Sequence, residues 1–176
     1  PQRQALEWLS SDVGLKTYSN DRKLQRFALA TFYFSTGGAL WKRDDGWLST
    51  DNECTWFTTS GTPPCDQDGL YVSLDLFDND LNGTIPAELG LLSNHLITMN
   101  LVREGDGSSL YGTIPTELGL LAQLEFFNVR GNELEGSIPL EFVKITGLRR
   151  VIVRQYMLSG QLPTVIGIWS KVGFLV

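Results

Sequence analysis

The sequence predicts an α/β solenoid, in which similar coils stack and share a parallel β-sheet behind a helical N-terminal segment. Two observations predict this fold. First, one apolar pattern recurs four times after residue 70, with equivalent residues 25, 28 and 24 positions apart at Leu74, Met99, Phe127 and Val151. Second, the apolar residues before residue 70 follow a helical period instead. One coil cannot shield its own apolar face, so stacking must supply the core.

Composition excludes several classes of function. The 176 residues carry 14 basic and 20 acidic side chains, a net charge of −6, and no run of lysine or arginine. This balance argues against nucleic acid or an anionic membrane as partner. One histidine and two cysteines nearly exclude a His/Cys zinc site, and no cofactor is expected. No apolar run is long enough to cross a bilayer, so membrane attachment is expected only through segments outside this chain.

Helical spacing runs through Pro1–Ser11 and Asp21–Thr36. Asn20 or Asp21 is expected to cap the second helix, and the glycines at 37 and 38 to end it. The expected apolar face of this helix consists of Leu24, Phe27, Ala28 and Thr31.

Each coil is predicted to contain one strand, one tight turn and one helical turn. Alternation such as Leu74 and Leu76 predicts a short strand with one buried face. A glycine column then permits positive φ or close approach of neighbouring coils, at Gly83, Gly112, Gly136 and Gly160. An apolar-proline pair follows in every coil, which suits the start of a short helical turn. A fifth coil begins near Val172 and Leu175.

These columns closely resemble the plant-type leucine-rich repeat, L-x-x-L-x-L-x-x-N-x-L-x-G-x-I-P-x-x-L-G-x-L. The resemblance covers about Tyr71 to the C-terminus, and G-x-I/L-P recurs four times in register. It implies a right-handed superhelix with the parallel sheet on the concave face. In the family, the asparagine column bonds the backbone of adjacent coils. Here that column reads Asn79, Glu104, Asn132 and Tyr156, so interruptions are expected in the second and fourth coils.

The segment before the coils resembles the N-terminal cap of this family, in the variant common in algal members. Its tryptophans and its cysteine pair, Cys54 and Cys65, carry the resemblance. Residues 1–69 are therefore expected to form a cap with a disulfide, and residues 70–176 four repeats plus the start of a fifth, cut short. A disulfide fits an oxidising compartment, whereas two reduced thiols in a cytosolic protein are the alternative. Asn82 begins an N-glycosylation sequon.

The resemblance places ligand-binding residues on the concave face. The candidates are Phe77, Asp78, Asn100, Arg103, Phe126, Asn128, Arg130, Arg150 and Arg154. Acidic residues occupy the first coil and arginines the later ones, so a protein, peptide or acidic glycan ligand is expected on coils two to four. The alternative is a solvated charged face without a ligand. The loop Gly105–Ser109, inserted in the second coil, is a second candidate contact or a tolerated insertion.

No catalysis is expected. Asp75, Asp78 and Asp80 invite a glycosidase hypothesis, but no apolar pocket is predicted that would raise the pKa of one of them. A Ser–His–acid triad would need His95, which is expected to be an ordinary exposed histidine. The sequence therefore predicts a recognition module of an extracellular or cell-surface, receptor-like protein. A structural, adhesion or matrix protein and a secreted enzyme inhibitor of the same family are the alternatives.

Overall fold

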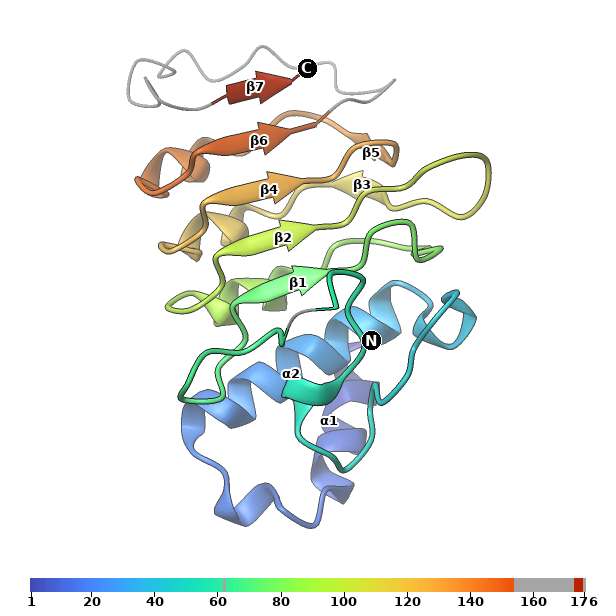
Figure 1. Ribbon diagram of the computed structural model, residues 1–176, viewed down its shortest axis with the longest axis vertical. Helices are drawn as coiled ribbons and strands as arrows, with labels where there is room; N and C mark the ends of the chain where they lie inside the picture. Colours follow the sequence, from blue (N-terminus) through green and yellow to red (C-terminus); the bar gives the residue numbers. More distant parts are fainter. Residues whose placement is uncertain (62, 154–172, 176) are drawn as a thin grey trace.

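The computed structural model describes residues 1–61, 63–153 and 173–175, and the coils of its second half stack in one direction (Figure 1). A parallel sheet runs in the order β1-β2-β4-β6-β7. Its strands are β1 (Ser73–Asp75), β2 (Thr98–Asn100), β4 (Phe126–Asn128), β6 (Arg150–Ile152) and β7 (Gly173–Leu175). The pairing aligns Leu74, Met99, Phe127 and Val151, which confirms the predicted repeat register. The strand β7 confirms that a fifth coil begins.

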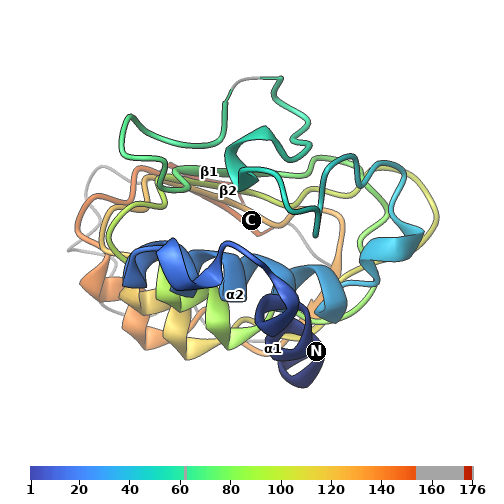
Figure 2. The ribbon, with the colours of Figure 1, turned by 90° about the horizontal axis from the view of Figure 1, so that it is seen from below.

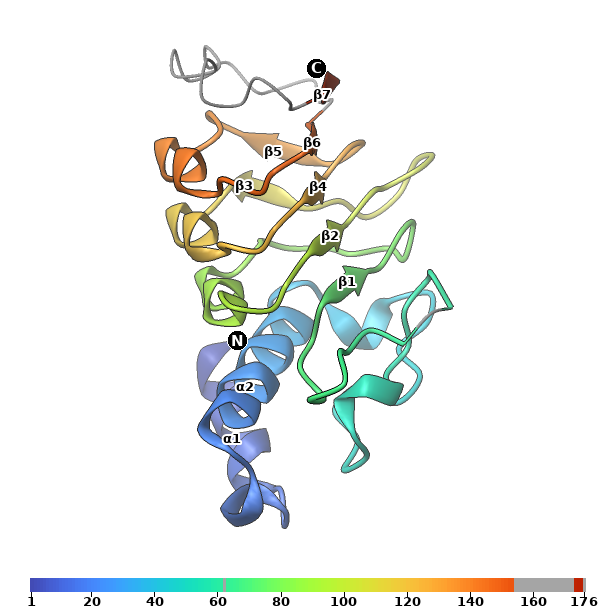
Figure 3. The ribbon, with the colours of Figure 1, turned by 60° about the vertical axis from the view of Figure 1, so that its left-hand side comes forward.

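A short 3₁₀ helix closes each of the first three coils behind the sheet (Figure 3). These helices are η4 (Ala87–Leu92), η5 (Thr116–Leu120) and η6 (Leu140–Lys144). Each follows the proline of the apolar-proline pair, which adopts an extended conformation just outside the helix. The predicted helical turn is thus confirmed, with the proline one position earlier than expected. The fourth-coil residues Arg154, Tyr156 and Gly160, and Val172, lie outside the described residues.

Two glycines mark places where the backbone leaves no room for a side chain. A Cβ on Gly83, at φ 144°, would lie 1.9 Å from the carbonyl oxygen of Ser35. A Cβ on Gly131, at φ 81°, would lie 2.1 Å from the carbonyl oxygen of Arg103 in the preceding coil.

The structure also contains a second, two-stranded parallel sheet that the sequence did not predict. It is formed by β3 (Tyr111–Thr113) and β5 (Glu133–Glu135), which come after the strands of the main sheet in the second and third coils.

The helical segment lies at the β1 end of the stack. It contains α1 (Gln2–Ser11), η1 (Leu15–Thr17), α2 (Asn20–Ser35), η2 (Gly38–Leu40) and η3 (Glu53–Thr55). The helix α2 packs against η4 of the first coil. Its N-cap is Ser19, whose hydroxyl accepts a hydrogen bond from the Arg22 amide, so the predicted cap at Asn20 or Asp21 was wrong by one or two residues.

The predicted apolar face of α2 was also partly wrong. Leu24 is 44% exposed, whereas Leu29 and Phe32 are completely buried. Gln25 and Arg26 are buried beside them. The hydrophobic pattern misplaced the face because two polar side chains enter the interior, where they find partners.

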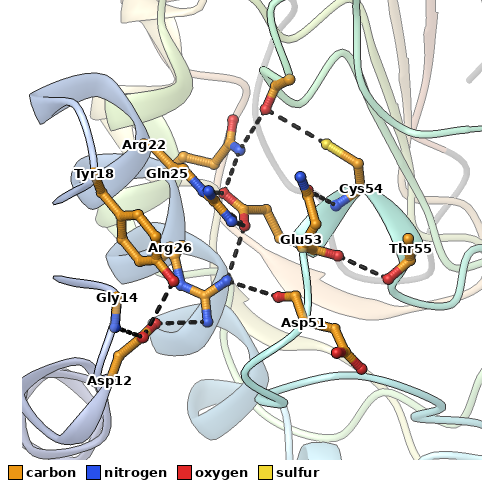
Figure 4. Close-up of polar contacts among 12 residues, drawn as sticks. Asp12, Gly14, Tyr18, Arg22, Gln25, Arg26, Asp51, Glu53, Cys54 and Thr55 are labelled. Carbon is orange, nitrogen blue, oxygen red and sulfur yellow. Dashed lines mark hydrogen bonds and ion pairs between the residues drawn. The ribbon is translucent and has the colours of Figure 1, made fainter.

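Arg26 is the centre of a buried polar cluster that joins three separate segments (Figure 4). Its guanidinium lies 2.8 Å from Glu53 and 3.0 Å from Asp12, and all three side chains are at most 3% exposed. Arg22 adds a second ion pair to Glu53 at 3.0 Å. Gln25 donates to Glu53 at 2.9 Å and accepts a hydrogen bond from the Tyr71 amide at 2.6 Å. The cluster therefore ties α1, α2 and η3 to the first coil.

The electrostatics of Glu53 follow from this environment. Burial by itself would raise the pKa of Glu53, but the hydrogen bond from Arg22, followed by those from its own backbone, Gln25 and Arg26, outweighs burial and lowers it. Glu53 is therefore ionised in the folded protein at neutral pH, as its ion pairs with Arg26 and Arg22 require.

A disulfide joins Cys54 and Cys65, as the sequence predicted, and the loop that it closes lies along the edge of β1. The Thr59 amide donates to the Asp75 carbonyl at 2.9 Å, and the Pro64 carbonyl accepts from the Val72 amide at 2.7 Å. The outer edge of the sheet at β1 is thus covered.

One hydrophobic core runs without a break from the tryptophans of the helical segment through the leucines of the coils.

Candidate recognition surface

The five-stranded sheet directs alternate side chains away from the 3₁₀ helices. In β1, β2 and β4 the middle residue is buried and its two neighbours are partly exposed. Because the strands pair in register, the outward side chains form columns across the coils. One column is Ser73, Thr98, Phe126 and Arg150, and the next is Asp75, Asn100, Asn128 and Ile152. We call these two columns, with the turns that follow them, the sheet face.

The sheet face is bounded at the first coil. Figure 2, which looks along the stack from the helical end, shows the segment that carries η3 standing beyond the outer side of the sheet, opposite α2. Figure 3 shows the same segment beside β1. A partner on the sheet face would therefore meet the segment that carries η3 at β1 and have free access only over the later coils.

A lysine of the helical segment neutralises the acidic end of the sheet face. The Lys42 ammonium lies 2.7 Å from a carboxylate oxygen of Asp78 and 3.4 Å from one of Asp80. Asp78 also accepts a hydrogen bond from the Glu104 amide at 2.9 Å. The bond from Lys42 and, after it, the bond from Glu104 lower the pKa of Asp78. This geometry keeps Asp78 ionised, which does not suit a general acid.

The predicted arginines are only partly available to a ligand. Arg130 forms an ion pair with Glu104 at 2.7 Å. The Arg103 guanidinium donates to the Gly131 carbonyl at 3.1 Å. Arg150 is exposed and makes no ion pair within the part of the chain that the structure describes. Along the predicted gradient from acidic to basic coils, several charged side chains therefore form local ion pairs. Arg150 in β6 keeps an available positive charge.

Uncharged side chains occupy the middle of the sheet face. Asn100 donates to Asp75 at 3.0 Å, and the Asn128 side-chain oxygen accepts from the Arg130 amide at 3.2 Å. Phe126 and Phe77 are both partly exposed. Val102, two residues after Asn100, is buried at 4% exposure. The alternation ends with β2 at Asn100, and in the turn that follows the apolar side chain goes inward.

Comparison with solved structures identifies the fold. The plant peptide hormone receptor RGFR1, solved in complex with RGF2, is 28% identical and aligns with 60% of this chain and 16% of its own, at a TM-score of 0.52. The BIR2 ectodomain from Arabidopsis thaliana is 25% identical and aligns with 99% of this chain and 78% of its own, at a TM-score of 0.58. A plant ice-binding protein, 24% identical, aligns with 76% of this chain and 41% of its own, at a TM-score of 0.59.

Together, the repeat register and these receptor ectodomains decide the family. The chain is a plant-type leucine-rich repeat protein. It spans only about a sixth of the length of RGFR1. No protein-family model matches the sequence, and a search of curated proteins found no match.

In this leucine-rich repeat protein, the residues of the asparagine column hydrogen-bond neighbouring backbone groups wherever the residue is asparagine. Asn132 donates to the Leu101 carbonyl of the preceding coil at 2.7 Å and accepts from the Leu110 amide at 3.0 Å. Asn79 belongs to the first coil, which follows the helical segment. Its side chain hydrogen-bonds the Arg43 backbone of that segment instead of the backbone of a preceding coil. Glu104 points to solvent, which confirms the predicted interruption in the second coil.

The remaining candidates of the leucine-rich repeat protein lie away from the sheet face. The Asn82 side chain is exposed, while its backbone amide donates a hydrogen bond to the Thr36 carbonyl at the end of α2. The loop at residues 105–109 projects from the edge of the stack after β2 (Figure 1). His95 is only partly exposed and lies 3.5 Å from Asp66, so the expectation of an ordinary exposed histidine was wrong.

Within the described ranges, no group of three or more His, Cys, Asp or Glu side chains is arranged to hold a metal ion. No helix in the same ranges has the length and apolar character to cross a membrane.

Proposed function

We propose that this chain is a non-catalytic recognition module of an extracellular or cell-surface protein, and that it binds a protein or peptide partner through the sheet face. One observation carries the proposal: neighbouring coils place outward side chains in unbroken columns over β2, β4 and β6, while the alternate residues form the core. Such a surface can vary in chemistry without disturbing the scaffold.

The similar structures support this role. RGFR1 is described as a peptide hormone receptor in complex with RGF2, and BIR2 as an ectodomain. A peptide lying across the columns would contact several coils at once. A matrix or adhesion role, or inhibition of a secreted enzyme, would use the same scaffold with a different partner.

A selection experiment with a matched control tests the proposal. A random-peptide phage library is selected on the 176-residue chain, and the peptides obtained are measured against two variants. Thr98→Arg places a bulky charge on the sheet face, and Thr113→Arg makes the same change on the exposed two-stranded sheet. The proposal expects Thr98→Arg to weaken binding about tenfold or more and Thr113→Arg to leave it unchanged. Peptides that bind both variants equally well would disprove the use of the sheet face.

The extracellular location needs its own measurement. The Cys54–Cys65 disulfide fits an oxidising compartment, and the exposed Asn82 is accessible to glycosylation. Mass spectrometry of the protein from its native source, without reduction, should find the disulfide intact and a glycan on Asn82. Free thiols together with an unmodified Asn82 would disprove this location.

We also propose that residues 1–69 act as the cap of a right-handed superhelix formed by residues 70–176. The packing of α2 on η4, the covered edge of β1 and the shared core support a capping role.

A further inference from the structure

A row of exposed leucines follows the side of the stack that carries the 3₁₀ helices, opposite the sheet face (Figure 3). Leu91 is the fifth residue of η4 and is 41% exposed, and Leu120 is the fifth residue of η5 and is 57% exposed. Leu24 of α2, 44% exposed, lines the same small recess as Leu91. Lys144 holds the equivalent position in η6, so the row ends in the third coil. We call Leu24, Leu91 and Leu120 the leucine row.

The core does not depend on apolar side chains at the two coil positions of this row. Buried leucines already stand two residues before and one residue after each of them, at Leu89 and Leu92 in the first coil and at Leu118 and Leu121 in the second. A half-exposed leucine leaves apolar area in water, and burial of that area against a partner is favourable. The leucine row therefore offers an apolar contact that neither the core nor the sheet face uses.

Carboxylates flank the leucine row. Asp21 lines the recess that Leu24 and Leu91 share. The Cβ of Glu117 lies beside Gly90 in η4, and the Cβ of Glu141 lies beside Gly119 in η5. These two glycines directly precede the exposed leucines. Within the part of the chain that the structure describes, Asp21, Glu117 and Glu141 form no ion pair.

Basic side chains near the leucine row are few. Neither η4 nor η5 contains a basic residue, whereas each contains one glutamate. Lys23 precedes Leu24 in α2, and consecutive residues of a helix point about 100° apart, so the two side chains leave the helix on different sides. Lys144 is exposed at the far end of the row. The face along η4 and η5 is therefore apolar with a negative border.

We propose that the leucine row docks a basic amphipathic helix of a protein partner, on a surface separate from the sheet face. Residues three or four apart on one side of an α-helix rise by roughly 4.5–6 Å, close to the roughly 4.8 Å between neighbouring strands. An apolar stripe can therefore meet one coil after another, while lysines or arginines beside it face Asp21, Glu117 and Glu141. A second copy of this chain fits less well, because two such faces bring like charges together.

A library of displayed helices tests the proposal. A helix of about 20 residues, with a fixed leucine stripe and random residues beside it, is displayed on phage and selected on the 176-residue chain. The helices obtained should be rich in Lys and Arg at the random positions. Their affinity should fall about threefold or more between roughly 50 and 500 mM NaCl, because salt screens exposed ion pairs.

Two matched pairs of variants locate the binding. Leu120→Arg should weaken it about tenfold or more, whereas Val13→Arg, at a position 92% exposed in the helical segment, should leave affinity within about twofold. Glu117→Gln should weaken binding about threefold. Glu133→Gln removes the same charge from the exposed side of β5 and should leave affinity within about twofold.

Each contrary outcome overturns a named part of the proposal. Helices without basic enrichment, or equal losses on Glu117→Gln and Glu133→Gln, would overturn the charge complementarity. Failure to enrich any helix, or helices insensitive to Leu120→Arg, would overturn the leucine row as a docking surface. Sedimentation of the 176-residue chain should show a monomer, and a dimer that Leu120→Arg abolishes would make a second copy the occupant instead. Circular dichroism of each variant confirms that a loss of binding does not come from unfolding.

Discussion

At the scale of single residues, Arg26 organises the helical segment. It is completely buried, pairs with Glu53 and Asp12, and lies near the rings of Trp8 and Trp56, with its guanidinium carbon 4.8 and 5.3 Å from their centroids. A buried ion pair adds little stability compared with apolar residues that pack equally well, but removing one partner leaves an uncompensated charge. The position of Glu53 next to Cys54 links this cluster to the disulfide loop.

We expect Arg26→Met to destabilise the protein by about 3–5 kcal/mol, because Glu53 and Asp12 would stay buried with fewer partners. Urea unfolding monitored by tryptophan fluorescence measures this change. Arg3→Met is the matched control, since the Arg3 side chain is 90% exposed and its one ion pair among the described residues is with Glu7, one helical turn away. That variant should lose less than about 1 kcal/mol. If both variants lost the same free energy of unfolding, the buried cluster would contribute no more to stability than the exposed ion pair of Arg3.

At the scale of elements, the tight turns decide how closely the coils approach. Gly131 combines a positive φ of 81° with a backbone oxygen of the preceding coil at 2.1 Å from any added Cβ. Gly69 has a similar φ of 76° but nothing within 4 Å of such a Cβ. The two glycines therefore separate backbone strain from close contact between coils.

Gly69→Ala should cost about 1–2 kcal/mol, the penalty of a left-handed conformation for a residue with a Cβ. Gly131→Ala should cost clearly more, because the second and third coils must also move apart. Thermal or urea unfolding of both variants measures the difference. If the two variants were equally stable, contact between coils at Gly131 would not limit the packing of the stack.

At the scale of the whole molecule, the helical segment and the coils share one core. Tyr71, Leu74 and Leu89 of the first coil are completely buried within it. A stack of coils has two open ends, and an uncovered apolar end favours aggregation. The helical segment covers the end at β1.

Deleting residues 1–69 should therefore expose the first coil, so that the shortened protein aggregates. Size-exclusion chromatography and light scattering follow this outcome. The full chain, prepared in parallel, is the reference. A monodisperse and folded fragment of residues 70–176 would contradict a capping role for the helical segment.

The sequence alone determined the repeat, the register of its strands and the position of the helical turns. It could do so because each coil repeats the same local choices of apolar residue, glycine and proline, so that one alignment fixes the columns. It also indicated the disulfide and the interrupted asparagine column at Glu104. The repeat features depend on neighbours along the chain or one coil away, whereas the disulfide was expected because the segment that holds the two cysteines resembles the N-terminal cap of the family.

Only the tertiary structure decided which polar groups meet. Arg26 and Gln25 enter the core of the helical segment because Glu53 and Asp12, distant in sequence, arrive beside them. In the same way, Lys42 and Glu104 reach Asp78 and Arg130 from other segments, so these two residues of the predicted charge gradient form ion pairs. Ion pairs between segments have no period in the sequence, since they depend on where the side chains of separate elements come together in space.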